Sequence, residues 1–474
     1  MSRPTQRRRD RPRPLLALCL VLGVLPSCAP QAKDAAPPVV LPETFSHTGT
    51  EPVPEKWWLA LGDAQLNALV EQALAGNLNL RATWDRLDQA AAVARRAGAD
   101  LYPSLTGTAG AERTRTVTAG RPRDYQKSFS LGLAAGYEVD LWGRVRSTAK
   151  AAELEVSASR EDLAAAAITL AAEVAGTWYG ILELRGQIAL LDSQIRTNEE
   201  YLELVTLRFR RGKVSAVDVL QQRQLVEATR AEQVQTESRL RVLEHQLAIL
   251  TGRPPAALAA RAEGELPALP PAPRTGLPAE LIRKRPDIRG AYHRLQEADQ
   301  RVAAAVADRF PRISLAAGAD TSAEEVRNLF DNWLAGLAAN LTAPLFDGGE
   351  REAEVDRTRA AASERLHAYG QAVLESLKEV EDALVQERQQ QRFLASLDQQ
   401  LDLAAKATEQ TRQQYVNLDY LRVLDALKSQ QHLQRTRIQA QRELVQFRIN
   451  LYRALGGGWE MARPAAGGDA RAAR

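Results

Sequence analysis

The stretch from Arg144 to Arg211 constrains the fold more than any other part of this chain. It contains no proline, and apolar side chains recur along it at alternating spacings of four and three residues. This spacing keeps one side of a helix apolar over many turns and predicts a coiled-coil contact. At a rise of about 1.5 Å per residue, some 65 residues make a rod roughly 100 Å long. Such a reach is typical of a protein that crosses a compartment.

Two polar residues interrupt this apolar seam, Thr177 and Asn198. Its members are Leu163, Ala167, Leu170, Val174, Thr177, Ile181, Leu184, Ile188, Leu191, Ile195, Asn198, Leu202, Val205 and Phe209.

The N-terminus has the pattern of an export signal. Six arginines and one aspartate are followed by an apolar run from Leu15 to Leu25, which is too short to span a hydrocarbon layer about 30 Å thick. The sequence Leu25-Pro26-Ser27-Cys28 resembles the lipobox of bacterial lipoproteins, which implies that Cys28 becomes the acylated, palmitate-bearing first residue. An acyl chain tethers a protein without spanning the membrane. The alternative is a plain signal peptide with an incidental cysteine.

Charge and composition exclude several classes of function. The formal net charge is +3, and the signal segment alone contributes +5, so the remainder carries −2 and offers no basic face to nucleic acid. The chain contains no glycine-rich phosphate loop and no nucleophile elbow. The histidines do not have the spacing of metal ligands. We therefore expect a protein that is not an enzyme and has no cofactor and no metal. The histidines are His47, His245, His293, His367 and His432.

Two stretches of alternating residues predict β-hairpins, at 104–142 and 312–346. Large apolar residues occupy every second position, and small or polar residues stand between them. The pattern occurs twice with a period of about 208 residues, because Tyr102-Pro103-Ser104 reappears as Phe310-Pro311-Arg312. The sequence thus predicts a duplicated half-protein.

This duplication divides the chain into six segments. A helix over Asp63 to Gly98 opens the first repeat. The segments are a signal peptide (1–27), a lipidated N-terminus with a Pro-rich spacer (28–56), a first repeat (57–255, with a helical hairpin at 143–250), a linker (256–278), a second repeat (279–458, with a helical hairpin at 349–455) and a disordered tail (459–474).

Four strands in one chain are too few to close a barrel that holds water. The alternation of the strands matches that of transmembrane β-barrels. Several chains sharing one barrel would remove the exposed strand edges. We therefore predict a mixed membrane protein, mainly α, whose coiled-coil helices continue from a shared β-barrel as a helical tube.

The chain resembles the TolC-like outer-membrane efflux proteins, in particular the NodT/OprM-like lipoprotein branch that works with RND pumps. The residues that carry the resemblance are Trp57-Trp58 with Asp63 and Leu66, Tyr137-Glu-Val-Asp-Leu-Trp-Gly-Arg144, Gly212 with Asp218-Val-Leu220, Leu250-Thr-Gly252, Arg285-Pro-Asp-Ile-Arg289 and Pro344-Leu-Phe-Asp-Gly-Gly349.

The resemblance implies a homotrimer that is lipid-anchored in the outer membrane and extends into the periplasm as an α-barrel. Its shared barrel would have roughly twelve transmembrane strands. The implied function is a passive exit duct for small molecules or drugs. The implied partners are a periplasmic adaptor (membrane fusion) protein, an inner-membrane RND pump and outer-membrane lipid.

The resemblance also implies a gate at the periplasmic tip of the helical hairpins. Acidic residues ring the aperture in the family, and the matching positions here are Asp218 and Asp425. Tyr415 matches a tyrosine that makes a hydrogen bond at the tip, and Arg422 stands where some members carry another aspartate. The competing interpretation is that both aspartates cap helices and that Tyr415 and Arg422 are solvated.

Two other functions remain open from the sequence. One is an exit duct for type I protein secretion, which shares the same architecture. The other is a non-conducting coiled-coil lipoprotein that spaces the outer membrane from the cell wall and needs the rods but not the strands.

Overall fold

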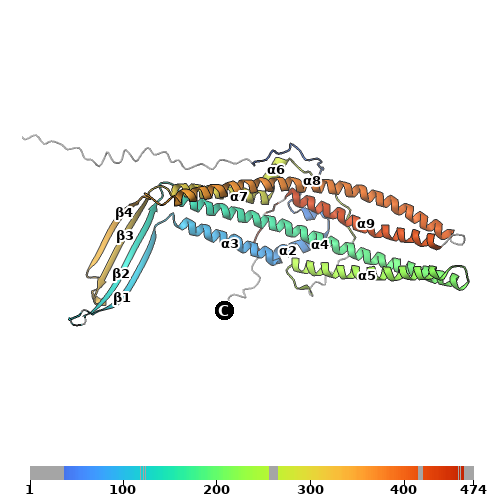
Figure 1. Ribbon diagram of the computed structural model, residues 1–474, viewed down its shortest axis with the longest axis horizontal. Coiled ribbons are helices and arrows are strands. Elements are labelled where there is room, and N and C mark those ends of the chain that lie inside the picture. The colour runs from blue at the N-terminus through green and yellow to red at the C-terminus, as the bar shows by residue number, and fades with distance from the viewer. Residues whose placement is uncertain are drawn as a thin grey trace, which may run out of the picture. The chain divides into compact units, whose positions relative to one another are not determined.

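The computed structural model describes residues 37–117, 119–120, 122, 124–255, 265–414, 420–456, 458–459 and 461–463. Figure 1 shows the elements in chain order. They are η1 (Trp57–Leu61), α2 (Ala64–Gly76), α3 (Leu78–Ala99), β1 (Ser104–Thr116), β2 (Asp124–Val139), α4 (Arg144–Arg210), α5 (Ala216–Leu250), α6 (Pro278–Lys284), α7 (Pro286–Ala307), β3 (Arg312–Ala323), η3 (Val326–Asn328), β4 (Trp333–Thr342), α8 (Glu350–Gln413) and α9 (Tyr420–Leu455).

The described residues form two compact units. The first combines Arg96–Ala151 with Asp299–Ala360 and holds the four strands and the helix ends that join them. The second combines Ala36–Arg95, Ala152–Ala298 and the residues from Ala361 onward, and it is mainly helical.

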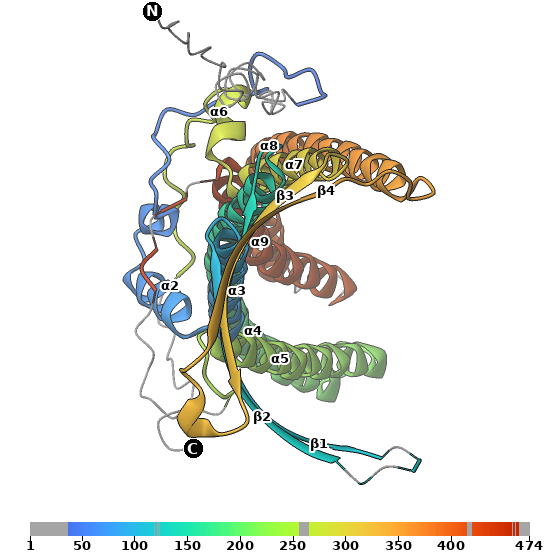
Figure 2. The same cartoon turned by 90° about the vertical axis from the view of Figure 1, so that its left-hand side faces the viewer.

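The first unit contains one antiparallel sheet in the order β1-β2-β3-β4. The strands curve as Figure 2 shows. Leu133 pairs with Gly107 on one side and with Ala319 on the other. Directly paired residues point to the same side of an antiparallel sheet, so all odd-numbered strand residues share one face.

The odd face is rich in large apolar residues, and the even face is lined mostly by small or polar ones. The odd face includes Leu105, Phe129, Leu131, Leu133, Tyr137, Val139, Ile313, Leu315, Trp333, Leu337 and Leu341, and the even face includes Ser104, Thr106, Thr108, Ser128, Ser130, Gly132, Ser314, Gly318, Asp320, Gly336 and Asn340.

The strand ends differ from those predicted. β2 begins at Asp124 and ends at Val139, before the predicted hairpin end at 142, because Asp140 turns to accept hydrogen bonds from the first turn of α4. β4 ends at Thr342 and does not continue to Phe346, since Pro344 has no N–H to donate to a strand ladder.

The core of the second unit is built on α4. From Leu163 to Leu191 most seam residues are buried, which confirms the packing contact that the heptad spacing predicted. Trp57 and Trp58 are fully buried in the same cluster. α4 is long and apolar enough to cross a membrane by composition, but 78% of its most apolar window is buried inside the protein. Its apolar side chains therefore serve packing between helices.

The predicted single helix over Asp63 to Gly98 is wrong, because Asn77 breaks it into α2 and α3. Asn77 has an extended backbone, and its side-chain oxygen accepts a hydrogen bond from Leu80 N at 3.0 Å. Its amide donates to the carbonyl of Leu250 at 2.9 Å. The residue thus caps α3 and ties it to the end of α5.

Arg448 forms a buried ion pair in the same unit. Only 1% of its side chain is exposed, and its guanidinium donates two hydrogen bonds to the carboxylate of Glu387, at 2.8 and 2.6 Å. It also donates to the carbonyls of Pro270 and Pro271, which belong to the predicted linker. Burial lowers the pKa of Arg448, but the hydrogen bonds with Glu387 outweigh that effect and raise it. One side chain therefore fixes the linker onto α8 and α9.

We predict that Arg448→Met lowers the free energy of unfolding by about 3–5 kcal/mol, because it leaves the Glu387 carboxylate buried without its partner. Thermal unfolding followed by circular dichroism measures the loss. Lys378→Gln, which breaks an exposed pair with Asp382, is the matched control and should cost less than about 1 kcal/mol. The double variant Arg448→Met/Glu387→Met should be more stable than Arg448→Met alone. Equal losses of unfolding free energy in the two variants would contradict this account.

Candidate functional site

The turn between α4 and α5 is closed by Gly212 and Ser215. Gly212 has a φ of 66°, a left-handed conformation that favours glycine. The Ser215 hydroxyl accepts a hydrogen bond from Asp218 N, and the Asp218 carboxylate accepts from Ser215 N at 2.8 Å. This reciprocal arrangement is a capping box. Asp218 therefore caps α5, whatever further role it has.

The other predicted tip residues do not meet Asp218 within the chain. Asp425 and Arg422 lie on the first turns of α9 and are exposed, and no hydrogen bond or ion pair joins either to Asp218 among the described residues. Tyr415 and Cys28 lie outside the described residues. Asp218, Asp425 and Arg422 therefore do not form a ring within one chain. Their role in a gate remains a prediction.

A buried polar layer near the tip joins α4, α5 and α9. Its centre is Asn198, which is fully buried. Gln431 of α9 donates to the Asn198 side-chain oxygen at 2.8 Å, and the Asn198 amide donates to Thr229 of α5 at 3.1 Å. Gln222 donates to the Asn198 carbonyl at 2.6 Å and accepts from the Tyr420 hydroxyl. The sequence showed Asn198 only as an interruption of the seam.

Apolar contacts surround this layer on the side of the tip. Val205, Tyr420, Val423 and Leu424 form a buried cluster. The start of α9 is therefore attached to the first helical hairpin by directional hydrogen bonds and by apolar packing. Directional bonds of this kind specify one arrangement of packed helices, because a slipped arrangement would leave buried polar groups without partners.

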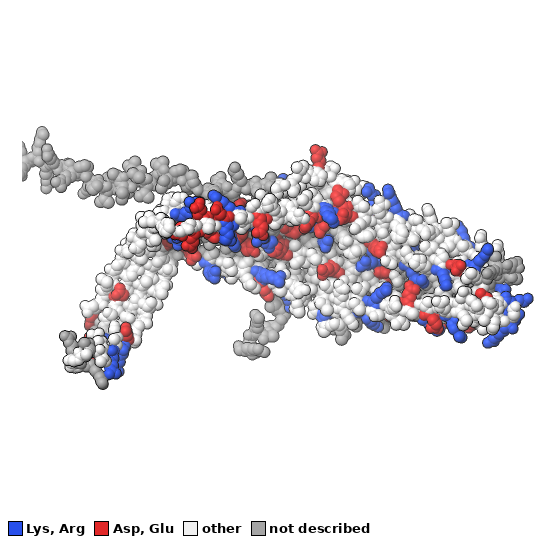
Figure 3. Space-filling model, viewed as in Figure 1, with Lys and Arg blue, Asp and Glu red and all other residues white. Residues whose placement is uncertain are grey.

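Basic side chains gather at the α4–α5 turn. The residues expected at the tip from the sequence do not include them. Arg210, Arg211 and Lys213 are all exposed there. Figure 3 shows Lys and Arg at this end of the helices. The described part of the tip is thus more basic than the family resemblance implies.

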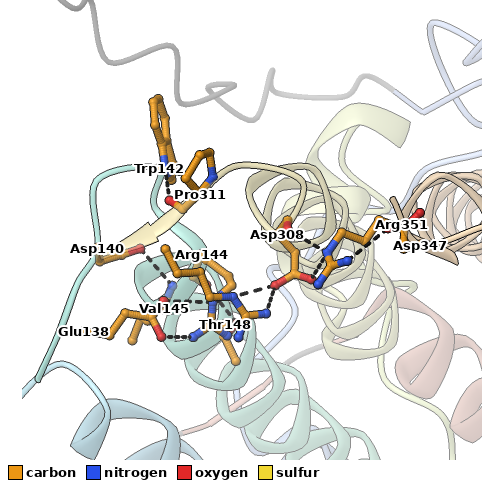
Figure 4. A network of polar contacts seen from close by, with 11 residues as sticks. Glu138, Asp140, Trp142, Arg144, Val145, Thr148, Asp308, Pro311, Asp347 and Arg351 are labelled. Atoms are coloured by element: carbon orange, nitrogen blue, oxygen red, sulfur yellow. Dashed lines mark hydrogen bonds and ion pairs between the residues drawn. The ribbon is translucent and has the colours of Figure 1, made fainter. Parts of the chain in front are cut away.

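A second polar network lies in the first unit, where strands give way to helices (Figure 4). Arg144 donates to Glu138 at 3.1 and 2.7 Å and lies 4.0 Å from Asp308. Arg351 approaches the same aspartate at 3.3 Å, and Arg312 also pairs with it. The Asp308 carboxylate therefore forms ion pairs with arginines from α4, α8 and β3.

The network keeps its groups charged. The hydrogen bond with Glu138 raises the pKa of Arg144, against the effect of burial. The hydrogen bond from Arg351 lowers the pKa of Asp347 below its usual range. The contribution of Asp347 to stability is thus present near neutral pH and is lost as pH falls through its lowered pKa.

The same junction explains the motif from Tyr137 to Arg144. Asp140 accepts hydrogen bonds from the backbone N–H groups of Val145 and Arg146, at 3.1 and 2.9 Å. The indole of Trp142 donates to the carbonyl of Pro311 at 2.8 Å. Asp140 therefore caps the start of α4, and Trp142 fastens the same segment next to the start of β3. No group of three or more His, Cys, Asp or Glu side chains that could hold a metal occurs among the described residues.

We predict that Asn198→Leu loosens the start of α9. The substitution leaves the Gln431 amide without its acceptor and removes the hydrogen bond that Thr229 accepts, which costs about 1–3 kcal/mol. Amide hydrogen exchange of residues 420–431 should be accelerated by about tenfold or more. Thr197→Val, one residue away on the solvent side, is the control and should leave exchange unchanged. Equal exchange in wild type and Asn198→Leu would show that the layer does not hold α9.

Comparison with known proteins agrees with this architecture. A family model described as outer membrane efflux protein matches residues 69–253 and 277–457. The pyoverdine export outer membrane protein OpmQ of Pseudomonas aeruginosa is 33% identical over 468 residues, which cover 95% of this chain and 97% of that protein. The outer membrane protein OprJ of the same organism is 33% identical over 419 residues, 86% of this chain and 87% of that protein.

A solved structure of the outer-membrane channel OprN is also similar. It matches with a TM-score of 0.84 and 29% identity, and the match covers 91% of this chain and 100% of that chain. The two parts matched by the family model take in most of the described helices and all four strands. The chain belongs to the outer membrane efflux protein family.

Proposed function

We propose that this chain is the outer-membrane exit duct of a tripartite, RND-type efflux system, working as a homotrimer that is gated at its periplasmic tip. The observation that carries the proposal is the register of the sheet, which places large apolar residues on the odd face and small or polar residues on the even face. A sheet with this division fits a barrel wall between lipid and a water-filled bore.

The apolar face is bare within one chain. Leu337 is 85% exposed and Leu105 is 73% exposed, and every residue of β1 and β4 is exposed. An apolar surface of this extent is unusual for a protein that stays in water and marks a lipid or protein contact. The strands have ten to sixteen residues, which meets the nine to eleven that a tilted membrane strand needs.

The two edges of the sheet call for further copies of the chain. β1 and β4 each pair with one strand only. Unpaired backbone groups cost several kcal/mol each in hydrocarbon, so an open sheet does not persist there. Three copies joined edge to edge would give about twelve strands, enough for a wide closed barrel.

The family and the sequence support a wider assembly. A lipid on Cys28 would anchor the protein in the outer membrane. The chain carries no motif for nucleotide chemistry, so energy would come from an inner-membrane RND pump reached through a periplasmic adaptor. The relative OpmQ is named for pyoverdine export, which supports small molecules as the substrate class over secreted proteins.

The proposed gate combines the tip aspartates with the buried polar layer. Asp218 and Asp425 would form the ring at the aperture when three protomers meet, with Tyr415 and Arg422 as its neighbours. The layer centred on Asn198 holds α9 against α4 and α5 in each protomer. Opening would require α9 to move away from these helices, which the layer opposes.

A pair of neighbouring substitutions tests the two faces of the sheet. Leu337→Lys puts a charge on the lipid side, at a cost of about 2–4 kcal/mol near the middle of the bilayer. Ala338→Lys puts the same charge on the bore side. We expect the first to abolish heat-modifiable trimers and the second to preserve them while lowering cation conductance in planar bilayers. Equal tolerance of both substitutions would contradict the face assignment.

A second comparison separates gating from helix capping at Asp218. Asn keeps the oxygen that accepts from Ser215 N but removes the charge, whereas Ala removes both. If the charge acts in the gate, Asp218→Asn combined with Asp425→Asn raises single-channel conductance while the thermal unfolding midpoint stays the same. If Asp218 only caps α5, the Asn variants conduct like wild type and only Asp218→Ala lowers stability. Absence of conductance in every variant would argue for the non-conducting lipoprotein instead.

A further inference from the structure

Charges at the free end of the first hairpin are sorted by face. Arg113, Arg115 and Lys127 occupy odd positions, so all three lie on the apolar face of the sheet. The acidic residues of the same end, Glu112 and Asp124, occupy even positions on the opposite face. In Figure 3 the sheet surface is white over most of its length, and charged side chains gather at this end.

The three bases lie close together, and no described residue on their face of the hairpin end is acidic. Arg113 is paired directly with Lys127 across the strands, and Arg115 with Tyr125. Opposed residues of an antiparallel pair have Cβ atoms about 4.5–5.5 Å apart, and like charges there are unfavourable. Both guanidinium groups lie over the Tyr125 ring, at 5.4 and 5.9 Å from its centre. No carboxylate shares this face among the described residues of the hairpin end, so an external anion would relieve the repulsion.

The cluster lies just beyond the apolar band. Phe129, paired with Ala111, is the next odd position toward the helices, and Arg113 is two residues from Ala111, or about 7 Å. From Phe129 to Val139 the strand rises roughly 33 Å, which becomes about 25 Å across a bilayer at a tilt near 40°. The bases therefore stand at the depth of lipid headgroups, an argument that rests on the proposed lipid contact of the odd face.

We propose that Arg113, Arg115 and Lys127 form a binding site for the phosphate groups of an anionic lipid in the outer leaflet. Guanidinium groups bind phosphate through two parallel hydrogen bonds, and lysine adds a point charge. The acyl chains of the same lipid would lie along Phe129 and Leu131. This arrangement explains why bases share the apolar face while acids face the bore.

The second hairpin has no such site. Its free end carries the acidic residues Asp320, Glu324, Glu325 and Asp331, and its one base, Arg327, pairs with Glu325 at 2.6 Å. The proposed site therefore occurs once in each chain, and Arg327 provides a matched control at the same end of the sheet.

The test compares lipid retention by the purified full-length protein. Wild type, the triple variant Arg113→Gln/Arg115→Gln/Lys127→Gln and Arg327→Gln are incubated in detergent with bisphosphorylated lipid A, with phosphatidylcholine or with inorganic phosphate, and bound molecules are counted by native mass spectrometry. A base near an anionic lipid surface contributes about fivefold. We expect lipid A binding to fall by about 100-fold in the triple variant and to be unchanged in Arg327→Gln.

Several results would overturn the proposal. They are equal binding of lipid A by wild type and the triple variant, an equal loss in Arg327→Gln, equal binding of phosphatidylcholine, and binding of inorganic phosphate as tight as that of lipid A. If the triple variant does not form trimers, the single variants Arg113→Gln and Lys127→Gln carry the test with a loss of about fivefold each. Heat-modifiable migration and conductance of wild type are recorded first, so failure of the membrane assignment is distinguished from failure of the lipid site.

Discussion

Burial of one face of α4 is the interaction on which the helical unit depends. α4 contributes half of the buried residues in the large core cluster, and α2, α5, α9 and η1 pack against it. Two glycines of α4 allow these helices to come close, because a Cβ at Gly176 would lie 2.7 Å from the side chain of Gln446, and one at Gly180 would lie 2.9 Å from that of Leu243. α4 thus has glycines at the positions where side chains of α9 and α5 come too close for a larger residue.

Much of the fold could be predicted from periodicity alone. The long helix, the two strand pairs and the alternation of their faces follow from spacings of 3.5 and of two residues, which are local properties of a chain. The break at Asn77 could not be found in this way, because it depends on a hydrogen bond to Leu250, far away in sequence. Trp459, which we placed in a disordered tail, packs its ring against that of Trp58 for the same non-local reason.

The candidate site was predictable to a smaller extent. Family resemblance pointed to Asp218, and the structure adds that this residue caps α5. The partners of Asn198 and the three arginines around Asp308 come from separate elements, so no window of sequence shows them together. On β1 and β2 the bases have odd residue numbers and the acids have even ones, which can be read from the sequence. This sorting became informative only once the register showed which residues face each other.

The carboxylate of Asp308 has a consequence for how the protein can vary. Arg144 stands before the linker in the chain, whereas Asp308 and Arg351 stand after it. The two similar parts of the chain are therefore linked electrostatically at this carboxylate, although each arginine also has a partner in its own part, Glu138 for Arg144 and Asp347 for Arg351. If they were produced as separate polypeptides, each arginine would keep its own partner, and the contact between Arg144 and Asp308 would form only when the two polypeptides met. A substitution at Asp308 is thus felt at Arg144, 164 positions earlier in the chain, as well as at Arg351.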